Sequence, residues 1–336
     1  MTGNDKNNRA IHRLTALWAL CESGLGGWLH ALKIPLTGFL VGGFAVVIIS
    51  LLAHYSRNNF KAMMQSLSLV LLVKFTASPH SPGPAYIAVA FQGVIGALLY
   101  RIIPSFSIAS VVFAITAMVE SATQKLLVMT LIFGKSIWAA LDGLYNSINK
   151  DFGGPDAPSF SMWVIGVYIA VYAVWGLLIG LWIAGLPRRI EQQSAAIRDQ
   201  FHTWKSGSTE IPVPARKRKN KLLFLLLILV MIVTVFLTAN ITNGTDQAYY
   251  IIARTLLVLL LLFGVVNPLL KWALQRWAGN KKSKAELQSL LDMMPELRGY
   301  IAPSYHLAKM QHNGLKRYTA FLMILIVITL QPTNEH

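Results

Sequence analysis

The sequence predicts an all-α, multi-pass membrane protein, and its composition gives the first reasons. Of 336 residues, 54% are apolar and only 13% are charged, about half the charged share of a soluble domain. The formal net charge is nevertheless +16. A disordered chain is excluded because it needs low hydropathy, and an ordinary nucleic-acid-binding protein carries its basic residues on a water-soluble fold. We therefore expect basic residues outside a bilayer and apolar helices within it.

Nine apolar segments are predicted to span the membrane, because a bilayer core of about 30 Å requires about 20 apolar residues in a helix. The first is the weakest, since it contains Glu22, and the ninth is short. Between the fifth and sixth, residues 135–150 are typical of an amphipathic surface helix. The nine segments cover residues 14–32, 36–55, 60–78, 84–103, 106–134, 160–186, 222–239, 248–271 and 318–330.

Lysine and arginine positions predict the orientation and the domains. Of the 30 basic residues, 18 lie in the segments 188–221 and 271–317, which places both segments and the N-terminus in the cytoplasm. A six-span module is predicted over residues 1–187, a basic cytoplasmic linker over 188–221 and a three-span module over 222–336. Within the last module, residues 283–315 are expected to form two cytoplasmic amphipathic helices, which end at Pro295 and Pro303.

Polar residues inside the predicted spans are the candidates for a binding site, because a charge there costs roughly 2.5–3.5 kcal/mol. Glu22 lies in the first span, Gln92 in the fourth, and Glu120 and Gln124 share one face of the fifth. The proline-rich segment 77–84 adds His80 at the outer side. Two interpretations stay open. Either these residues form a polar pocket for a small solute, or the polar residues of the spans pair with one another inside the membrane and His80 belongs to a plain proline turn.

Two stretches resemble the S component of the energy-coupling-factor (ECF) vitamin transporters: PLTGFLVGGFAVVIISLL and HSPGPAYIAVAFQGVIGALLYRIIP. Two others, IIARTLLVLLLLF and MMPELRGY, resemble the end of the T component in that family. The resemblance implies a bacterial cytoplasmic membrane, a vitamin-like or precursor solute, and docking of ABC-type ATPases on residues 283–315. The residues expected at that docking surface are Arg298, Lys309, Lys316 and Arg317. Where the family has an Ala-Arg-Gly triplet, this chain has Ala308-Lys309-Met310.

The chain has no phosphate-binding Gly-Lys-Ser/Thr loop, no His-Glu-x-x-His and no Gly-x-Ser-x-Gly motif. We therefore expect a transporter subunit without ATPase activity of its own, with no cofactor or metal. Its partners would be a small solute, membrane lipids and the ATPases, and no nucleic acid. The alternative is a non-transport membrane scaffold or assembly subunit that recruits a partner through its basic cytoplasmic segment.

Overall fold

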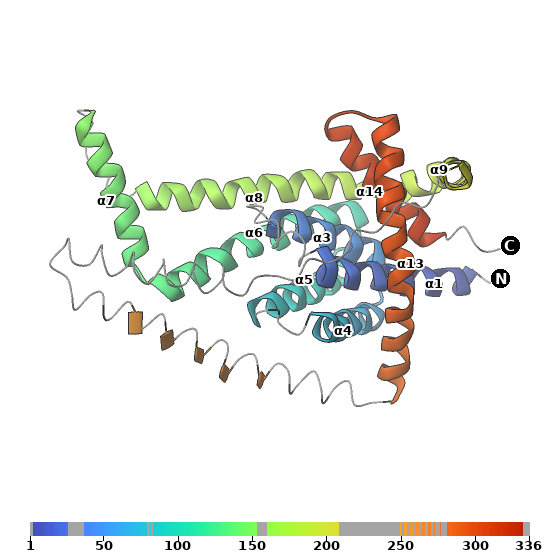
Figure 1. The fold of residues 1–336 in the computed structure, drawn as a ribbon, viewed down its shortest axis with the longest axis horizontal. Coiled ribbons are helices and arrows are strands. Elements are labelled where there is room, and N and C mark those ends of the chain that lie inside the picture. The colour runs from blue at the N-terminus through green and yellow to red at the C-terminus, as the bar shows by residue number, and fades with distance from the viewer. Residues whose placement is uncertain are drawn as a thin grey trace. The chain divides into compact units, whose positions relative to one another are not determined.

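The computed structural model describes residues 3–25, 37–78, 81, 83–152, 160–207 and 281–331, with isolated positions between 249 and 276. Every element in this part of the chain is a helix, and it contains no strand (Figure 1). The elements are α1 (Gly3–Leu20), η1 (Cys21–Leu25), α3 (Thr37–Tyr55), α4 (Phe60–Ala77), α5 (Gly83–Ile102), α6 (Phe106–Phe133), α7 (Ser136–Asp151), α8 (Phe160–Ala184), α9 (Leu186–Gly207), α13 (Lys281–Gln311) and α14 (Leu315–Leu330).

Four helices, α4, α5, α6 and α8, are long and apolar enough to cross a membrane. They coincide with the third to sixth predicted spans to within a few residues, which confirms an all-α membrane protein. The apolar part of α3, Phe39–Tyr55, is shorter. The ninth predicted span lies in α14. The seventh lies outside the described residues and the eighth is described only at isolated positions, so the total of nine spans stays a prediction.

The described helices group into two compact units. Unit 1 comprises Met1–Thr123, Tyr168–Thr209 and Leu270–His336, and unit 2 comprises Gln124–Val167 and Glu210–Leu269. Unit 1 thus contains helices from both ends of the chain, whereas the sequence predicts separate modules up to residue 187 and from residue 222. Those module boundaries stay a prediction.

Helix α1 occupies the interior of unit 1. All side chains from Leu14 to Cys21 are buried, so protein covers this part of the helix on every side. It packs against α3, α4, α13 and α14, as Figure 1 shows for α3 and α13. Of the first predicted span, 14–32, the structure describes the residues up to Leu25, where the single π-helical turn η1 ends.

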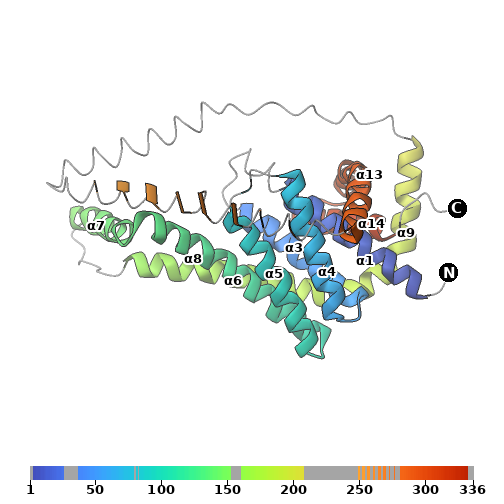
Figure 2. The same ribbon diagram turned by 90° about the horizontal axis from the view of Figure 1, so that it is seen from below.

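Helix α9 occupies most of the segment that the sequence predicts to be a polar linker. Its apolar side chains recur at helical spacing, and Ile190, Ile197 and Phe201 are buried. Figure 2 shows α9 next to α14, and α9 packs against both α14 and α13. Because most residues of this segment are polar, the sequence alone did not reveal this narrow apolar stripe.

Helix α13 runs without interruption from Lys281 to Gln311, whereas the sequence predicts two helices that end at Pro295 and Pro303. Pro295 faces outward, and buried side chains such as Leu290, Leu297 and Leu307 recur along the opposite face. A proline removes one backbone hydrogen bond, but packing of this face against α1, α4, α9 and α14 keeps the helix continuous.

Glycines bring the helices of unit 1 close together. A Cβ atom on Gly93 would lie 2.6 Å from the side chain of Leu67, and one on Gly96 would lie 2.7 Å from Ile49. On α8, a Cβ on Gly176 would meet the carbonyl oxygen of Ala114 at 2.7 Å. Small residues at such contacts are typical of membrane helices, because they let the backbones approach.

Candidate functional site

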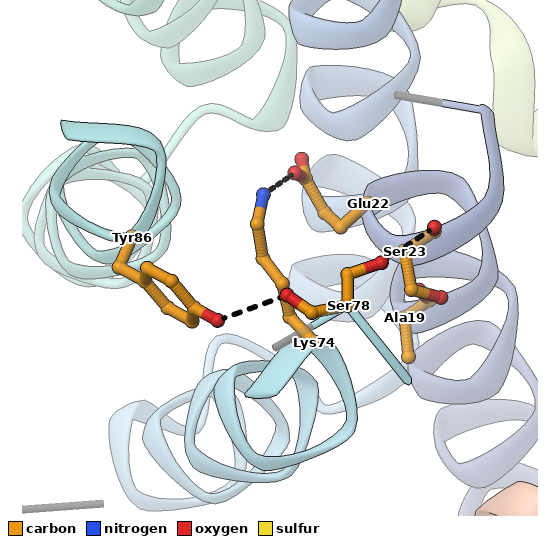
Figure 3. A network of polar contacts seen from close by, with 6 residues as sticks. All are labelled: Ala19, Glu22, Ser23, Lys74, Ser78 and Tyr86. Carbon is orange, nitrogen blue, oxygen red and sulfur yellow. Dashed lines mark hydrogen bonds and ion pairs between the residues drawn. The ribbon is translucent and has the colours of Figure 1, made fainter. Parts of the chain in front are cut away.

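The first part of the candidate site is a buried ion pair between Glu22 and Lys74 (Figure 3). The Lys74 ammonium lies 2.7 Å from Glu22 Oε2, and each side chain is only 6% exposed. Glu22 belongs to η1 and Lys74 to the last turn of α4, so the pair joins two helices. A π-helical turn widens the helix locally, and such turns are frequent at functional sites.

Hydroxyl groups and an aromatic ring surround this pair. Tyr86 of α5 donates a hydrogen bond of 3.4 Å to the carbonyl oxygen of Ser78, and Ser78 Oγ donates one of 3.1 Å to the carbonyl oxygen of Ser23. The Lys74 ammonium lies 5.9 Å from the centroid of the Tyr86 ring. Figure 3 shows these groups converging from η1, α4 and α5. The ammonium is thus balanced by a carboxylate and a ring face.

The sequence identified Glu22 but not its partner. Lys74 lies near the end of the third predicted span, where a lysine commonly extends its ammonium group to the membrane interface. One signal was available: Glu22 and Lys74 carry opposite charges inside the first and third predicted spans, and charged side chains within a membrane tend to pair with one another.

The second part of the candidate site lies where α3, α5 and α6 meet. Gln92 of α5 is buried, and its Nε2 atom lies 3.4 Å from the position that a Cβ on Gly42 would take. Ser121 Oγ of α6 lies 3.5 Å from the same point, and Met118 Cε lies 3.0 Å from it. The missing side chain of Gly42 therefore lets an amide, a hydroxyl and a thioether approach the backbone of α3 closely.

Glu120 precedes Ser121 and is half-buried in α6. Its Oε2 atom is buried and has no hydrogen-bond partner, and no other carboxylate oxygen in the described part of the chain is in this situation. A buried polar atom without a partner costs free energy, so such atoms are rare in folded proteins. Glu120 thus has an unused capacity to accept a hydrogen bond.

The structure does not bring all the predicted binding residues together. Along α5, Tyr86 beside the ion pair is about 9 Å from Gln92. Gln124 shares a face of α6 with Glu120 but is the first residue of unit 2. His80 lies outside the described residues. Glu22 and Gln92 therefore mark two different levels of unit 1.

The predicted partner-coupling residues lie on α13 and α14. Arg298, Lys309 and Lys316 are exposed, and Arg317 is half-buried, with its Nε donating a hydrogen bond of 3.4 Å to the carbonyl oxygen of His312. Their positive charges are thus presented outward or at the turn between the two helices.

A polar cluster that the sequence did not indicate joins α1 to α13 and α14. Arg13 lies 2.6 Å from Glu296 and donates a hydrogen bond of 2.5 Å to the carbonyl oxygen of Thr329. The Tyr300 hydroxyl also donates to Glu296, and burial raises the pKa of Tyr300. His12 lies 3.0 Å from the Ser289 hydroxyl, and burial lowers the pKa of His12. These contacts tie the two ends of the chain together.

A scan against models of protein families, a search of curated proteins and a search of solved structures each found no match for this chain. The buried polar groups and the exposed face of α13 are therefore the features of the chain that bear on its function.

Proposed function

We propose that this chain is the membrane subunit of a transporter for a small polar solute. Glu120 carries the proposal, because its buried Oε2 atom has no partner in the described part of the chain. Most buried polar groups have a hydrogen-bond partner within the protein, and among the buried side-chain atoms without one in the described part of the chain, this is the only carboxylate oxygen. A solute that donates a hydrogen bond would supply the missing partner.

The depth of Glu120 and Gln92 supports a path across the membrane. Glu120 lies near the middle of the 28-residue helix α6, and Gln92 near the middle of the 20-residue helix α5. A bilayer core is about 30 Å thick, so both residues belong near its midplane if these helices span it. Ionisable residues at that depth are expensive and mark the pathways of solutes or ions.

The contacts of α13 support a cytoplasmic partner. Helix α1 reaches α13 through Arg13 and Glu296, and α4 reaches it through Gln65, whose amide donates a hydrogen bond of 3.4 Å to Glu286. Nearer the C-terminal ends of these two helices, α4 and the η1 turn that continues α1 meet again in the Glu22–Lys74 pair. A protein that displaces α13 would therefore move both helices that carry the buried pair.

The resemblance to ECF transporters names the partner as a pair of ATPases and the solute as vitamin-like. In this proposal the N-terminus and α13 lie in the bacterial cytoplasm. Arg298, Lys309 and Lys316 would contact acidic groups of the ATPase, since all are exposed and basic.

The test is retention of a solute by the purified full chain. We would isolate the chain from native membranes in lipid nanodiscs, extract it and identify small molecules by mass spectrometry. Wild type would be compared with Gln92→Leu and Glu120→Gln. The matched control is Glu191→Gln, which neutralises an exposed carboxylate on α9.

We expect one polar molecule with wild type and the control, and at least a tenfold lower amount with Gln92→Leu and Glu120→Gln, as for a lost interaction of about 1.4 kcal/mol. Equal small-molecule content in all four preparations would refute the solute-binding part. That outcome would favour the scaffold alternative, which rests on the exposed basic side chains of α13.

A further inference from the structure

Helix α7 in unit 2 is held to its neighbours by contacts on one side. Trp138 Nε1 donates a hydrogen bond of 3.0 Å to Thr130 Oγ1 near the end of α6. The Asp142 carboxylate accepts bonds of 2.6 Å and 2.9 Å from the backbone nitrogen and hydroxyl of Ser161 at the start of α8. The orientation of α7 about its own axis is therefore defined.

An aromatic contact reinforces the same side of the helix. Tyr145 stacks on Phe160 with ring centroids 4.2 Å apart and an interplanar angle of 12°. Trp138, Asp142 and Tyr145 follow one another at spacings of four and three residues, so they share one face of α7.

A second face of α7 is apolar and is exposed in the described part of the chain. Leu144, Ile148 and Phe152 are 60%, 51% and 85% exposed. They recur every fourth residue and thus form a stripe along the helix and its end. A third sector contains Gly143, Ser147 and Lys150, which are also exposed but small or polar. The helix therefore has one face for protein, one apolar face and one polar face.

The membrane helices that precede and follow α7 in the chain also carry exposed apolar side chains. At the start of α8, Met162 and Trp163 are exposed, and at the end of α6, Leu127 and Leu131 are exposed. The chain leaves α6 through Gly134, whose φ of 72° permits a sharp turn directly before α7. Helix α7 therefore begins directly after α6, one of the four helices long and apolar enough to cross a membrane.

We propose that α7 is an interfacial helix whose stripe of Leu144, Ile148 and Phe152 inserts into the boundary between phospholipid headgroups and acyl chains. A helix with an apolar face and a polar face lies in this boundary, with its apolar side roughly 5–10 Å deep. The exposed Trp163 suits the same level, since tryptophan is enriched at membrane interfaces. Ser147 and Lys150 then face water.

The charges near the stripe indicate whether insertion of α7 requires anionic lipids. Lys135 precedes the helix and Lys150 lies in its last turn, but Asp142 and Asp151 offset these two positive charges. The helix has no basic cluster of the kind that requires anionic headgroups. Insertion is therefore expected in zwitterionic phosphatidylcholine alone.

Spin labels at single cysteines test this inference on the full chain. Cys21 is the only cysteine and is buried, so Cys21→Ala provides the background. Leu144→Cys, Ile148→Cys and Phe152→Cys report on the stripe, and Ser147→Cys is the control on the polar face. Each variant is reconstituted in phosphatidylcholine vesicles with and without phosphatidylglycerol. Collision of the label with oxygen and with a water-soluble nickel chelate is then measured.

We expect the ratio of oxygen to nickel collisions to be several-fold higher at the three stripe positions than at Ser147→Cys, with both lipid compositions. An equal ratio at all four positions would place the stripe in water and overturn the inference. Low collision rates with both reagents at the stripe would mean that protein covers it, either a second copy or another chain, and would also overturn it. Three independent stripe positions keep the test valid if one variant does not fold.

Discussion

Replacing Lys74 with methionine removes the positive charge that faces Glu22 and keeps a side chain of similar length. Both side chains are only 6% exposed, so water does not replace the lost ammonium. Breaking one partner of such a buried pair costs about 3–5 kcal/mol, because the remaining charge stays buried without a partner. We expect Lys74→Met to lower the free energy of unfolding by about that amount.

The double variant Glu22→Gln/Lys74→Met separates the pair from its surroundings. With both charges removed, no uncompensated charge remains, so the double variant is expected to be more stable than either single variant. The assay is unfolding in mixed micelles with increasing dodecyl sulfate, followed by circular dichroism. Lys61→Met on the same helix is the control, since Lys61 is exposed and its loss should change stability by at most about 0.5 kcal/mol. If the losses of Glu22→Gln alone and Lys74→Met alone simply add in the double variant, the two charges are not coupled and the buried pair does not account for the loss of stability.

Three further outcomes follow from other contacts of unit 1. Gly176→Ala should lower stability by about 1–3 kcal/mol because its Cβ would meet backbone, whereas Gly166→Ala on the same helix, with nothing within 4 Å, should be neutral or stabilising in the same unfolding assay. Burial lowers the pKa of His12, so the unfolded chain binds the proton more tightly than the folded chain does. The free energy of unfolding of wild type should therefore fall as the pH drops below about 6.5. His12→Asn should show less of this loss when the free energies of unfolding at pH 7.5 and pH 5 are compared. Arg13→Gln should cost about 1 kcal/mol, since Glu296 is partly exposed and solvent screens the pair, and hydrogen exchange should rise in α13 and α14; Arg298→Gln, an exposed control, should leave exchange unchanged.

Apolar length was enough to predict α4, α5, α6 and α8, because a run of about 20 apolar residues has few alternatives to a membrane helix. The continuity of α13 through Pro295 could not be predicted, since it depends on the buried face that α1 and α14 cover. The stripe of α9 was obscured because Ile190, Ile197 and Phe201 are spread among charged residues.

The candidate site was predictable residue by residue but not as an arrangement. Glu22, Gln92 and Glu120 stand out because polar groups are rare in apolar segments. Their partners depend on which helix turns face each other across the bundle. The approach of Gln92 and Ser121 to Gly42, for example, joins positions from three helices that lie far apart in the sequence.

Solute binding is tested most directly by the amount of small molecule retained by wild type and by Glu120→Gln, both purified from native membranes. We expect wild type to retain a polar solute in an amount nearly equimolar with the protein, and Glu120→Gln to retain at least tenfold less at unchanged folding. Identical small-molecule content in the two preparations would contradict a role for the unpartnered Glu120 oxygen in solute binding.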